Sequence, residues 1–334
     1  MKAIVLKAID TPLTLEEVVV PEIGPDEALV QIKAAGINKR DWWIWKGQYA
    51  GLKFPIIPGS DGCGIVTKVG SEVDASWQGK EVLIYPASDW GDNQAYQSKA
   101  FKILGLPDNG CFAQYVKVKG SMLYPRPRHL DFIQSAALPV AGLTAYRALF
   151  VRGRWQKGDK VLISGTGGGA ATFALQWAVA AAAEVWVTSG SDEKIQKAVS
   201  LGAKGGVNYK MQGWSSTLLE KAGSFDLIID SALGEGFSEL VTLAGSGGRI
   251  VFFGGTAGNI PPLNGRPLFW KQIDILGTTM GSPKDFKNML QFIEAHNITP
   301  VIDAVYPLKD AQLAFEHMST SGERFGKRIL QVEA

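Results

Sequence analysis

The stretch Gly158–Ala178 reads GDKVLISGTGGGAATFALQWA and decides the fold. Its run Val161-Leu162-Ile163 is uniformly apolar, which predicts a strand buried on both faces. Glycines end that run, and residues 170–183 follow, rich in Ala and without Pro or Gly, which favours a helix. A strand, a glycine turn and a helix in this order predict the first unit of a doubly wound, dinucleotide-binding fold.

We expect the glycine turn to hold phosphate groups. Gly165 permits the tight turn, while Gly167, Gly168 and Gly169 let the backbone approach a pyrophosphate. The N-terminus of the following helix offers unpaired N–H groups to the same anion. A glycine-rich turn can also be an ordinary loop. The sequence of the next strand is therefore needed to decide whether the turn binds a nucleotide.

That strand is expected at 184–188, about twenty residues after the glycines, where this fold reads the adenosine ribose. It ends in Ser189-Gly190-Ser191 instead of an acidic residue, which leaves room for a 2′-phosphate. Lys194, one turn into the next helix, can supply the countercharge, so NADP is favoured over NAD. The alternative is an ordinary helix cap at Ser191 followed by a solvated charged face.

Length and composition bound the remaining possibilities. At 334 residues the chain exceeds what one core usually supports, which predicts two domains. The net charge is +2 and the basic residues are scattered, so no nucleic-acid or membrane surface is expected. Two cysteines cannot form a disulfide framework, no signal peptide precedes the first strand, and the longest apolar segment is shorter than the ~20 residues that span a bilayer. We therefore expect a cytoplasmic location.

The rest of the chain divides into a β-rich part and an alternating part. The first part, before residue 126, holds short strand-like runs between Pro, Gly and Asp turns, at 2–6, 15–20, 28–34, 64–69 and 81–85. The second part holds helices at 131–137 and 142–150 before the central strand, and strands at 206–209, 225–230, 248–254 and 273–277 after it. This alternation predicts a parallel sheet of about six strands. A mixed tail follows, with helices at 283–295 and 309–318 and strands at 301–306 and 328–332.

Several phrases resemble the medium-chain dehydrogenase/reductase superfamily, especially its zinc-independent quinone oxidoreductases and enoyl or alkenal reductases. Residues 35–41, AGINKRD, resemble its Ala-Gly-Ile/Val-Asn-x-x-Asp segment, and residues 58–64, PGSDGCG, resemble its Pro-Gly-x-Asp/Glu-x-x-Gly turn. Further matches are 136–146, Leu201-Gly202-Ala203, Asn208-Tyr209 and Gly326-Lys327. The resemblance implies a GroES-like catalytic domain at 1–125, completed by 282–334, and a Rossmann NADP-binding domain at 126–281.

The chain differs from the zinc-dependent members of the superfamily at the positions that bind the metal. Those members place Cys where this chain has Asn38, and a His-Glu pair where it has Ser60-Asp61. A catalytic zinc needs three N, S or O ligands close together, and Asn38 and Ser60 are poor ligands. The three histidines lie outside the matching positions, and residues 89–109, where the superfamily's structural zinc loop would lie, contain no cysteine. We expect the chain to bind no zinc.

Without a Lewis acid, alcohol oxidation is unfavourable, because no group stabilises the negative charge that develops on the alcohol oxygen. Hydride donation to a quinone or an α,β-unsaturated carbonyl is easier, since such an acceptor delocalises the incoming charge. The expected function is therefore an NADPH-dependent reductase acting on one of these small molecules. The alternative is an NADPH-binding sensor or docking protein with little turnover.

The resemblance also implies catalytic residues. Asn38 and Asp41 would lie near the nicotinamide ribose and the substrate, and Thr144 would lie beside the nicotinamide. Simpler alternatives are the closing of a turn by Asn38, a strand-end aromatic at Tyr209 and a surface charge at Lys327.

For cofactor binding, the resemblance implies that a second set of residues surrounds the dinucleotide. Phe253-Gly254-Gly255 would lie beneath it, Gly281-Ser282 near the carboxamide, and Lys327 on the phosphate-ribose side. The residues framing the 2′-phosphate and the adenosine would be Ser189, Gly190, Ser191, Lys194 and Tyr209.

Aromatic residues gather at Trp42-Trp43-Ile44-Trp45 and Tyr49, and with Tyr85 and Trp90 they could line a pocket for planar acceptors. The alternative is plain packing between domains. Some quinone reductases of the superfamily carry Tyr where Trp43 stands, so no proton donor is assigned. Cys111 is expected in the core.

The last predicted strand indicates a homodimer. Residues 263–277 place large apolar groups before and within that strand, and an exposed apolar edge invites pairing with another chain. Members of the resembled superfamily commonly join their sheets there across a two-fold axis. The alternative is a monomer in which Phe269 and Trp270 cover a cleft between domains.

Overall fold

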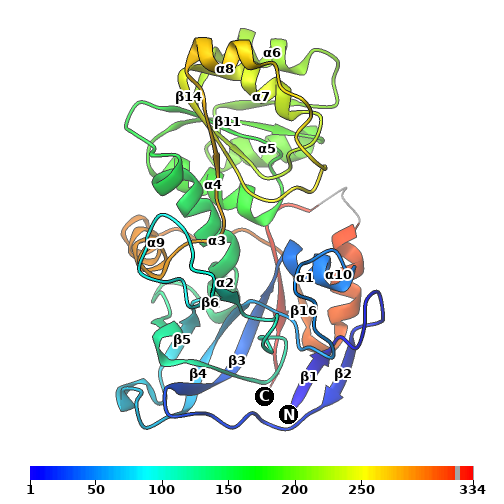
Figure 1. The fold of residues 1–334 in the computed structure, drawn as a ribbon, viewed down its shortest axis with the longest axis vertical. Coiled ribbons are helices and arrows are strands. Elements are labelled where there is room, and N and C mark those ends of the chain that lie inside the picture. The colour runs from blue at the N-terminus through cyan, green and yellow to red at the C-terminus, as the bar shows by residue number, and fades with distance from the viewer. Residues whose placement is uncertain (320–323, 334) are drawn as a thin grey trace. The chain divides into compact units, whose positions relative to one another are not determined.

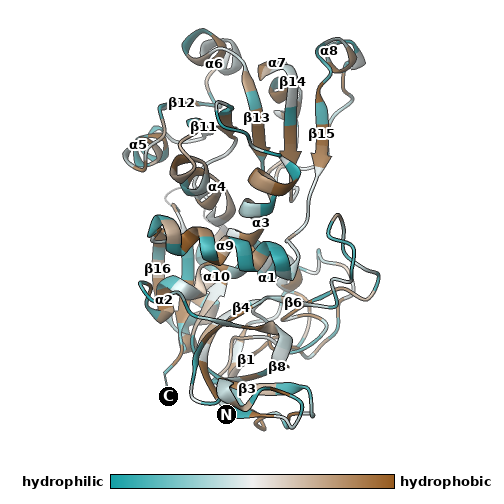
Figure 2. Cartoon of the chain, turned by 90° about the vertical axis from the view of Figure 1, so that its left-hand side faces the viewer, coloured by the Kyte–Doolittle hydropathy of each residue, from teal (hydrophilic) through white to brown (hydrophobic). Residues whose placement is uncertain are grey.

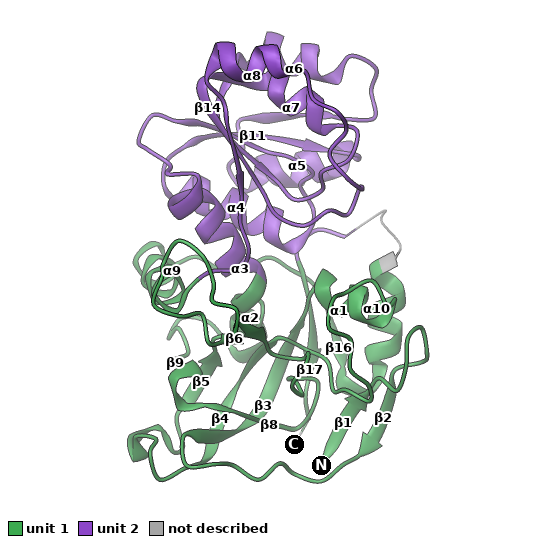
Figure 3. Cartoon of the chain, viewed as in Figure 1, with its two compact units in different colours: residues 1–140, 282–321, 327–334 green, residues 141–281, 322–326 purple. Residues whose placement is uncertain are grey.

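The computed structural model describes residues 1–319 and 324–333, and the chain divides into two compact units (Figure 1, Figure 3). Unit 1 contains Met1–Val140, Ser282–Ser321 and Lys327–Ala334, and unit 2 contains Ala141–Gly281 and Gly322–Gly326. The first boundary thus follows residue 140 and not residue 125 as expected. The reason is that helix Phe132–Ala136 packs on strands of unit 1.

Within the described residues, unit 1 is built on a seven-stranded sheet and two two-stranded sheets. Its strands are β1 (Lys2–Val5), β2 (Thr14–Glu17), β3 (Glu27–Ile37), β4 (Asp61–Val69), β5 (Glu81–Ile84), β6 (Ala87–Ser88), β7 (Lys102–Ile103), β8 (Tyr115–Lys119), β9 (Leu123–Pro125), β16 (Ile302–Pro307) and β17 (Lys327–Gln331). The large sheet has the order β16-β17-β3-β4-β5-β9, and β8 also pairs with β3. The β16–β17 pair is parallel, and the other pairs of this sheet are antiparallel.

Strand β3 sets the position of the polar residues in unit 1. Buried and partly exposed residues alternate along most of it, as in a strand covered on one face, but its last four residues are all buried. In the register of the sheet Arg328 pairs with Ile37, and Asp61 pairs with Gly36. The first residues of β17 and β4 therefore meet the buried end of β3.

The helices of unit 1 are α1 (Lys39–Trp45), α2 (Phe132–Ala136), α9 (Pro283–His296) and α10 (Ala311–Ser319), with 3₁₀ turns at Ala75–Trp77, Gly120–Met122 and Leu308–Asp310. Helix α1 begins directly after β3 and carries the aromatic run of the sequence. Its buried residues are Arg40, Asp41, Ile44 and Trp45, so one face of this short helix belongs to the core.

In unit 2 the chain alternates strictly between strand and helix after its first two helices. Those are α3 (Pro139–Tyr146), which begins at the boundary between the units, and its π-helical continuation Arg147–Arg152. The remaining elements are β10 (Lys160–Ile163), α4 (Gly169–Ala180), β11 (Glu184–Ser189), α5 (Asp192–Ser200), β12 (Gly205–Asn208), α6 (Trp214–Ala222), β13 (Phe225–Asp230), α7 (Phe237–Leu243), β14 (Ala244–Phe252), α8 (Gly265–Lys271) and β15 (Asp274–Gly277).

The six strands of this sheet are all parallel, in the order β12-β11-β10-β13-β14-β15. In order of sequence this is 3-2-1-4-5-6, the arrangement of dinucleotide-binding sheets, and the order reverses between β10 and β13. Figure 2 shows β13, β14 and β15 side by side at one end of the sheet. The predicted fold class, a doubly wound parallel sheet plus a GroES-like β-rich domain, is confirmed.

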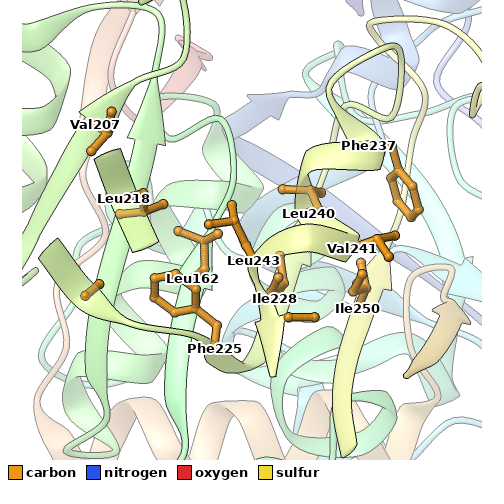
Figure 4. Close-up of a cluster of buried hydrophobic side chains, with 12 residues drawn as sticks. Leu162, Val207, Leu218, Phe225, Ile228, Phe237, Leu240, Val241, Leu243 and Ile250 are labelled. Carbon is orange, nitrogen blue, oxygen red and sulfur yellow. The ribbon is translucent and has the colours of Figure 1, made fainter. Parts of the chain in front are cut away.

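One core cluster fills the space between this sheet and two of its helices (Figure 4). Leu162 of β10, Ile228 of β13 and Ile250 of β14 are fully buried against Leu218 of α6 and Leu240 of α7. Burying a side chain of this size stabilises the fold by about 1.5–3 kcal/mol. The residues on either side of Leu162 are also buried, which explains the uniformly apolar run in the sequence.

No helix among the described residues combines the length and the apolar character needed to cross a membrane.

Candidate functional site

The glycine turn of unit 2 lies where the strand order reverses, between β10 and α4. Gly165 and Gly167 have φ angles of 69° and 125°, which favour glycine, and Gly168 is the N-cap of α4. A Cβ atom built on Gly165 would meet nothing within 4 Å, and one built on Gly168 would meet only Nη2 of Arg324, at 3.3 Å. The turn therefore leaves open space beside Gly165, whereas a Cβ atom on Gly167 would lie 2.9 Å from Lys194 Cδ and 3.1 Å from the Arg324 carbonyl oxygen.

Two unsatisfied features of the turn fit a phosphate ligand. No side chain caps the N-terminus of α4, and its first turn contains no acidic residue. Its backbone N–H groups are therefore available to an anion. The hydroxyl of Thr166 is buried and has no hydrogen-bond partner. These two features fit the prediction that Gly165, Gly167, Gly168 and Gly169 hold the pyrophosphate of a dinucleotide, and that contact stays a prediction.

The residues predicted to frame the adenosine end come together at the end of β11. Ser189 is buried, its Oγ donates to the carbonyl oxygen of Thr166 at 3.2 Å, and its own carbonyl accepts from Tyr209 N at 3.0 Å. A Cβ atom on Gly190 would lie 2.8 Å from the Tyr209 hydroxyl. Ser191 is the N-cap of α5, but its side chain makes no capping hydrogen bond.

One lysine lies beside the glycine turn and another beside Gly190. The stem of Lys194 passes the glycine turn, since its Cδ would be 2.9 Å from a Cβ atom on Gly167. The Cε of Lys210 would be 3.0 Å from a Cβ atom on Gly190. Lys194 was predicted from the sequence as a ligand of the 2′-phosphate, but Lys210 was not. Lys210 could have been found, because it directly follows the predicted Tyr209.

Three other predicted positions in unit 2 differ in their surroundings. Phe253 follows β14, and its N–H donates to the Asp230 carbonyl at the end of β13, at 3.1 Å. Because parallel strands end at the same edge, Phe253-Gly254-Gly255 lie at the edge that also carries the glycine turn. Thr144 is buried within α3, and Gly281 is the last residue of the long segment of unit 2.

In unit 1, Lys327 contacts Asn38, another of the predicted site residues. Its Nζ donates to the carbonyl of Ile37 at 3.0 Å, to Asn38 Oδ1 at 2.6 Å and to Asp61 Oδ2 at 3.0 Å. All three N–H groups of the ammonium are therefore used inside unit 1. Lys327 is only 3% exposed, so the alternative of a surface charge is wrong. Its contact with the phosphate-ribose side of a cofactor stays a prediction.

Asp41 lies in the same buried polar cluster. Its Oδ2 accepts from the backbone N–H of Asn38 at 2.8 Å, while its Oδ1 has no hydrogen-bond partner. Burial raises the pKa of Asp41 to about 6, against the opposing effect of the neighbouring Arg40 guanidinium. Burial likewise raises the pKa of Asp61, whose ion pair with Lys327 opposes the shift. Asp41 thus reaches its charged form only near neutral pH.

Arg40 fills the space beside Ser60. Its Nη1 donates to Ser60 Oγ at 2.9 Å and to the Leu104 carbonyl at 3.0 Å, and its Nη2 donates to the carbonyls of Ile103 and Leu106. The guanidinium thus ties α1 to the segment where the structural zinc loop of zinc-dependent relatives would lie. The sequence analysis did not single out Arg40, because a buried arginine cannot be told from an exposed one by its type.

Ser282 has a local structural role. It is the N-cap of α9, where its Oγ accepts from Asp285 N at 3.2 Å and its N–H donates to Asp285 Oδ2 at 3.0 Å. This reciprocal capping box explains a serine at the position without any ligand. Contact between Ser282 and a carboxamide stays a prediction.

The aromatic residues divide into core and half-buried members. Trp45 packs edge-on against Phe315, and Tyr85 and Trp90 are 2% exposed. These three belong to the buried core of unit 1. Trp42 and Trp43 are half-buried and pack against each other with ring centroids 5.0 Å apart.

The two cysteines are fully buried and unpaired. Burial raises the pKa of both thiols, which opposes the reactive thiolate form. A Cβ atom on Gly62 would lie 2.5 Å from the Cys111 sulfur, so Cys111 packs tightly in the core, as predicted. Over residues 1–319 and 324–333, no three or more His, Cys, Asp and Glu side chains are grouped so as to hold a metal ion.

Known families match both parts of the chain. Residues 24–128 match the alcohol dehydrogenase GroES-like domain, and residues 169–295 match the zinc-binding dehydrogenase family. A zinc-type alcohol dehydrogenase-like protein, YogA, of Leptosphaeria maculans is 36% identical over 96% of this chain and 95% of its own. The quinone oxidoreductase of Rattus norvegicus is 31% identical over 94% of this chain and 92% of its own.

Solved structures agree in fold. An NAD-dependent alcohol dehydrogenase superposes with a TM-score of 0.94 at 32% identity, covering all of both chains. The 2-octenoyl-CoA carboxylase reductase CinF, solved with NADP and 2-octenoyl-CoA, has a TM-score of 0.87 at 27% identity, covering 96% of this chain and 82% of its own.

The parallel sheet, the glycine turn at its switch point and the GroES-like unit together define a dehydrogenase-type protein. The chain belongs to the medium-chain dehydrogenase/reductase superfamily and is an oxidoreductase of that superfamily.

Proposed function

We propose that the chain is an NADPH-dependent reductase that transfers hydride to a quinone or an α,β-unsaturated carbonyl without a catalytic zinc ion. The observation that carries this proposal is the hydrogen bonding of Asn38 and Ser60, which stand where zinc-dependent members have ligands. Asn38 Oδ1 accepts from Lys327 at 2.6 Å, and Ser60 Oγ accepts from Arg40 at 2.9 Å. A zinc ion at this place would be repelled by the two cationic side chains, and both oxygens already accept hydrogen bonds from them.

The donor set supports the same conclusion, although two matches carry zinc in their names. A catalytic zinc takes three protein ligands, usually His, Cys or carboxylate. The nearby Cys111 is a poor ligand, because burial raises the pKa of its thiol and zinc binds the thiolate. Asp61 is already paired with Lys327.

The end of β11 supports NADPH over NADH. Ser189 and Gly190 stand where an acidic residue would bond the two ribose hydroxyls in an NAD enzyme. Lys210 passes Gly190 at this end of the strand and Lys194 passes Gly167 of the glycine turn, so both could supply positive charge to a 2′-phosphate. CinF was solved with NADP, and an alcohol dehydrogenase of similar fold is NAD-dependent. The fold alone therefore does not decide between the two nucleotides, and the choice depends on these side chains.

Bound NADPH would supply the hydride, and the chain's own residues would orient the acceptor. Because the Lys327 ammonium can only donate, it fixes the Asn38 amide with Oδ1 toward itself. Nδ2 is then the only atom of that amide left to donate. An amide N–H is suited to the acceptor's carbonyl oxygen, where negative charge grows as hydride arrives.

The test is steady-state NADPH oxidation with a panel of quinones and enones, in the presence of a metal chelator. The reductase predicts continuous turnover and a hydroquinone or a saturated carbonyl as product. A sensor or docking protein would bind NADPH without consuming it, and a zinc-dependent alcohol dehydrogenase would lose activity in the chelator.

We also propose a homodimer formed through the edge of the unit 2 sheet. Strand β15 is an edge strand, and the helix before it, α8, exposes 69% of Phe269 and 81% of Trp270. An unpaired strand edge next to large exposed apolar groups favours pairing with a second copy. A cytoplasmic location stays a prediction from the sequence.

A further inference from the structure

Arg40 is a buried arginine of α1 whose N–H groups all have partners. Its side chain is only 8% exposed. Nε donates to the Tyr49 hydroxyl at 3.3 Å, and Nη1 donates to Ser60 Oγ at 2.9 Å. Three further bonds go to backbone carbonyls of the segment 103–106. A guanidinium has five N–H donors, so each of them is used inside unit 1.

The three carbonyl oxygens converge on this one cation. Nη1 donates to Leu104 at 3.0 Å, and Nη2 donates to Ile103 at 3.3 Å and to Leu106 at 2.9 Å. Buried carbonyl oxygens need hydrogen-bond partners, and Leu104 and Leu106 are buried residues. Because the guanidinium is a rigid planar fork, its bonds fix the path of this backbone.

The segment 103–106 also closes a loop of unit 1. Ile103 pairs with Ala87, and the N–H of Leu104 donates to the carbonyl of Pro86 at 3.0 Å. The loop lies within residues 86–109, most of which correspond to the structural zinc loop of zinc-dependent relatives. Arg40 therefore holds the base of that loop against α1.

The same side chain contacts two parts of the proposed acceptor site. Nη1 lies 3.9 Å from Asp41 Oδ1, and Asp41 Oδ2 accepts from the backbone N–H of Asn38 at 2.8 Å. The guanidinium carbon also lies 5.0 Å from the centroid of the Tyr49 ring, within the range of a cation–π contact. Arg40 thus reaches Tyr49 directly and Asn38 through Asp41.

We propose that Arg40 is a positioning residue of the acceptor site, and that it orders this part of unit 1 as metal ions do in the zinc-dependent members. Its guanidinium joins Ser60, which stands where those members have a catalytic ligand, to the segment 103–106. The inference rests on the proposed function for its effect on turnover. Its effect on the order of the two segments does not depend on any activity.

Lysine should not replace this arginine. An ammonium has three N–H groups, so Arg40→Lys leaves at least two of the five acceptors without a donor. We expect kcat/KM for a quinone or an enone to fall by at least about tenfold, because a misplacement of about 1 Å can cost about a hundredfold. The dissociation constant of NADPH should change by less than about twofold, because the predicted nucleotide turn belongs to unit 2.

The experiment compares the wild type with Arg40→Lys, Arg40→Ala and a control. Hydrogen–deuterium exchange is measured over residues 38–49 and 103–110, and kcat/KM is measured well below the melting temperature. Exchange of both segments should be faster in the two Arg40 variants, with unit 2 unchanged. The matched control is Arg126→Lys, since Arg126 is another arginine of unit 1 whose Nε donates to Glu81 at 2.8 Å. It should leave both segments and kcat/KM unchanged.

Chemical rescue separates positioning from a general loss of stability. Millimolar guanidinium chloride should partly restore kcat/KM in Arg40→Ala and slow the exchange of both segments, whereas sodium chloride or urea at the same concentration should not. Unfolding by guanidinium needs molar concentrations, so the rescue is free of that effect. If Arg40→Ala does not fold, the comparison of Arg40→Lys with Arg126→Lys decides.

A lower melting temperature of Arg40→Lys with unchanged kcat/KM would overturn the inference, because Arg40 would then contribute to stability alone. Faster exchange throughout unit 1, without rescue by guanidinium, would also overturn it. A wild type that does not oxidise NADPH would overturn the proposed function and the acceptor role together. Exchange over residues 38–49 and 103–110 would then still decide whether Arg40 orders these segments.

Discussion

Lys327 Nζ lies 3.0 Å from Asp61 Oδ2, and the two side chains are 3% and 0% exposed. Removing two such charges from water is unfavourable, so the ion pair persists only because further hydrogen bonds complete it. Here Ile37 and Asn38 accept the other two ammonium hydrogens, and Val140 N donates to the second oxygen of Asp61. The pair joins the first residues of β17 and β4 across the end of β3.

Removing one partner of this pair should strongly destabilise unit 1. Lys327→Met leaves the Asp61 carboxylate buried without its cation, which typically reduces the free energy of unfolding by about 3–5 kcal/mol. The measurement is urea-induced unfolding followed by fluorescence. The control is Lys117→Met, which breaks the exposed Lys117–Glu27 pair of the same sheet and should change stability by less than about 1 kcal/mol. Equal losses of stability in the two variants would contradict the prediction that the Lys327–Asp61 pair is buried and stabilises unit 1.

The buried carboxyl of Asp41 predicts a specific pH dependence. Its pKa is about 6 in the folded chain against 3.8 for an unperturbed aspartate. Below about pH 3.8 the Asp41 carboxyl is protonated in both the folded and the unfolded chain. As the pH rises, the unfolded chain ionises first, so stability falls between about pH 4 and 6 and is constant above.

An Asp41→Asn variant lacks this titration. The difference in unfolding free energy, variant minus wild type, should therefore increase by up to about 3 kcal/mol between pH 4 and pH 7. Denaturant unfolding at several pH values measures it, with the exposed Asp108→Asn as control. A difference that stays flat with pH, or that decreases, would show that burial does not raise the pKa of Asp41.

We expect purified protein to contain far less than one zinc ion per chain, because the oxygens of Asn38 and Ser60 already accept from Lys327 and Arg40. Elemental analysis after expression with added zinc measures this directly. Stoichiometric zinc that survives dialysis against a weak chelator would refute the proposed metal-free site.

Cofactor preference provides a further prediction. Lys194→Ala should weaken NADPH by about tenfold or more and leave NADH nearly unchanged, since only NADPH carries the 2′-phosphate. Fluorescence titration with both nucleotides measures the ratio. The matched control is Lys197→Ala on the same helix, because Lys197 pairs with Glu193 at 2.7 Å. The assignment fails if Lys194→Ala weakens both nucleotides alike.

The architecture of unit 2 could be predicted because local signals agree with the fold. The apolar run 161–163 and the glycines after it need no distant partner to be recognised. The domain boundary was placed too early, because α2 looks like the start of the next domain in sequence and joins unit 1 only through packing.

Much of the candidate site could not be predicted, for a different reason. Arg324 reaches the glycine turn only through a chain crossing between units, and the sequence has no signal for that. Lys327 meets Asn38 through the register of β17 against β3. Helix α1 was missed because its seven residues, rich in Trp, have weak helix propensity, and tertiary packing of Ile44 and Trp45 supplies the stability.

The proposed dimer can be tested at residues that the core does not need. Ile273 and Ile275 pack against the core cluster of unit 2, so charges there would disturb folding and association together. Trp270 is 81% exposed on α8 and is absent from that cluster. A buried charge in an interface is strongly unfavourable, so Trp270→Glu should weaken association by at least about tenfold and leave the melting temperature of the monomer unchanged.

Light scattering at tens of micromolar should give a dimer for the wild type and a smaller mass for Trp270→Glu. The control is Val199→Glu, which places the same charge at an exposed apolar residue of α5 in the same unit and should remain dimeric. Weaker association of both variants would indicate a general charge effect and remove the support for this location. A monomeric wild type would exclude the dimer, and the apolar surface of α8 would then need another partner.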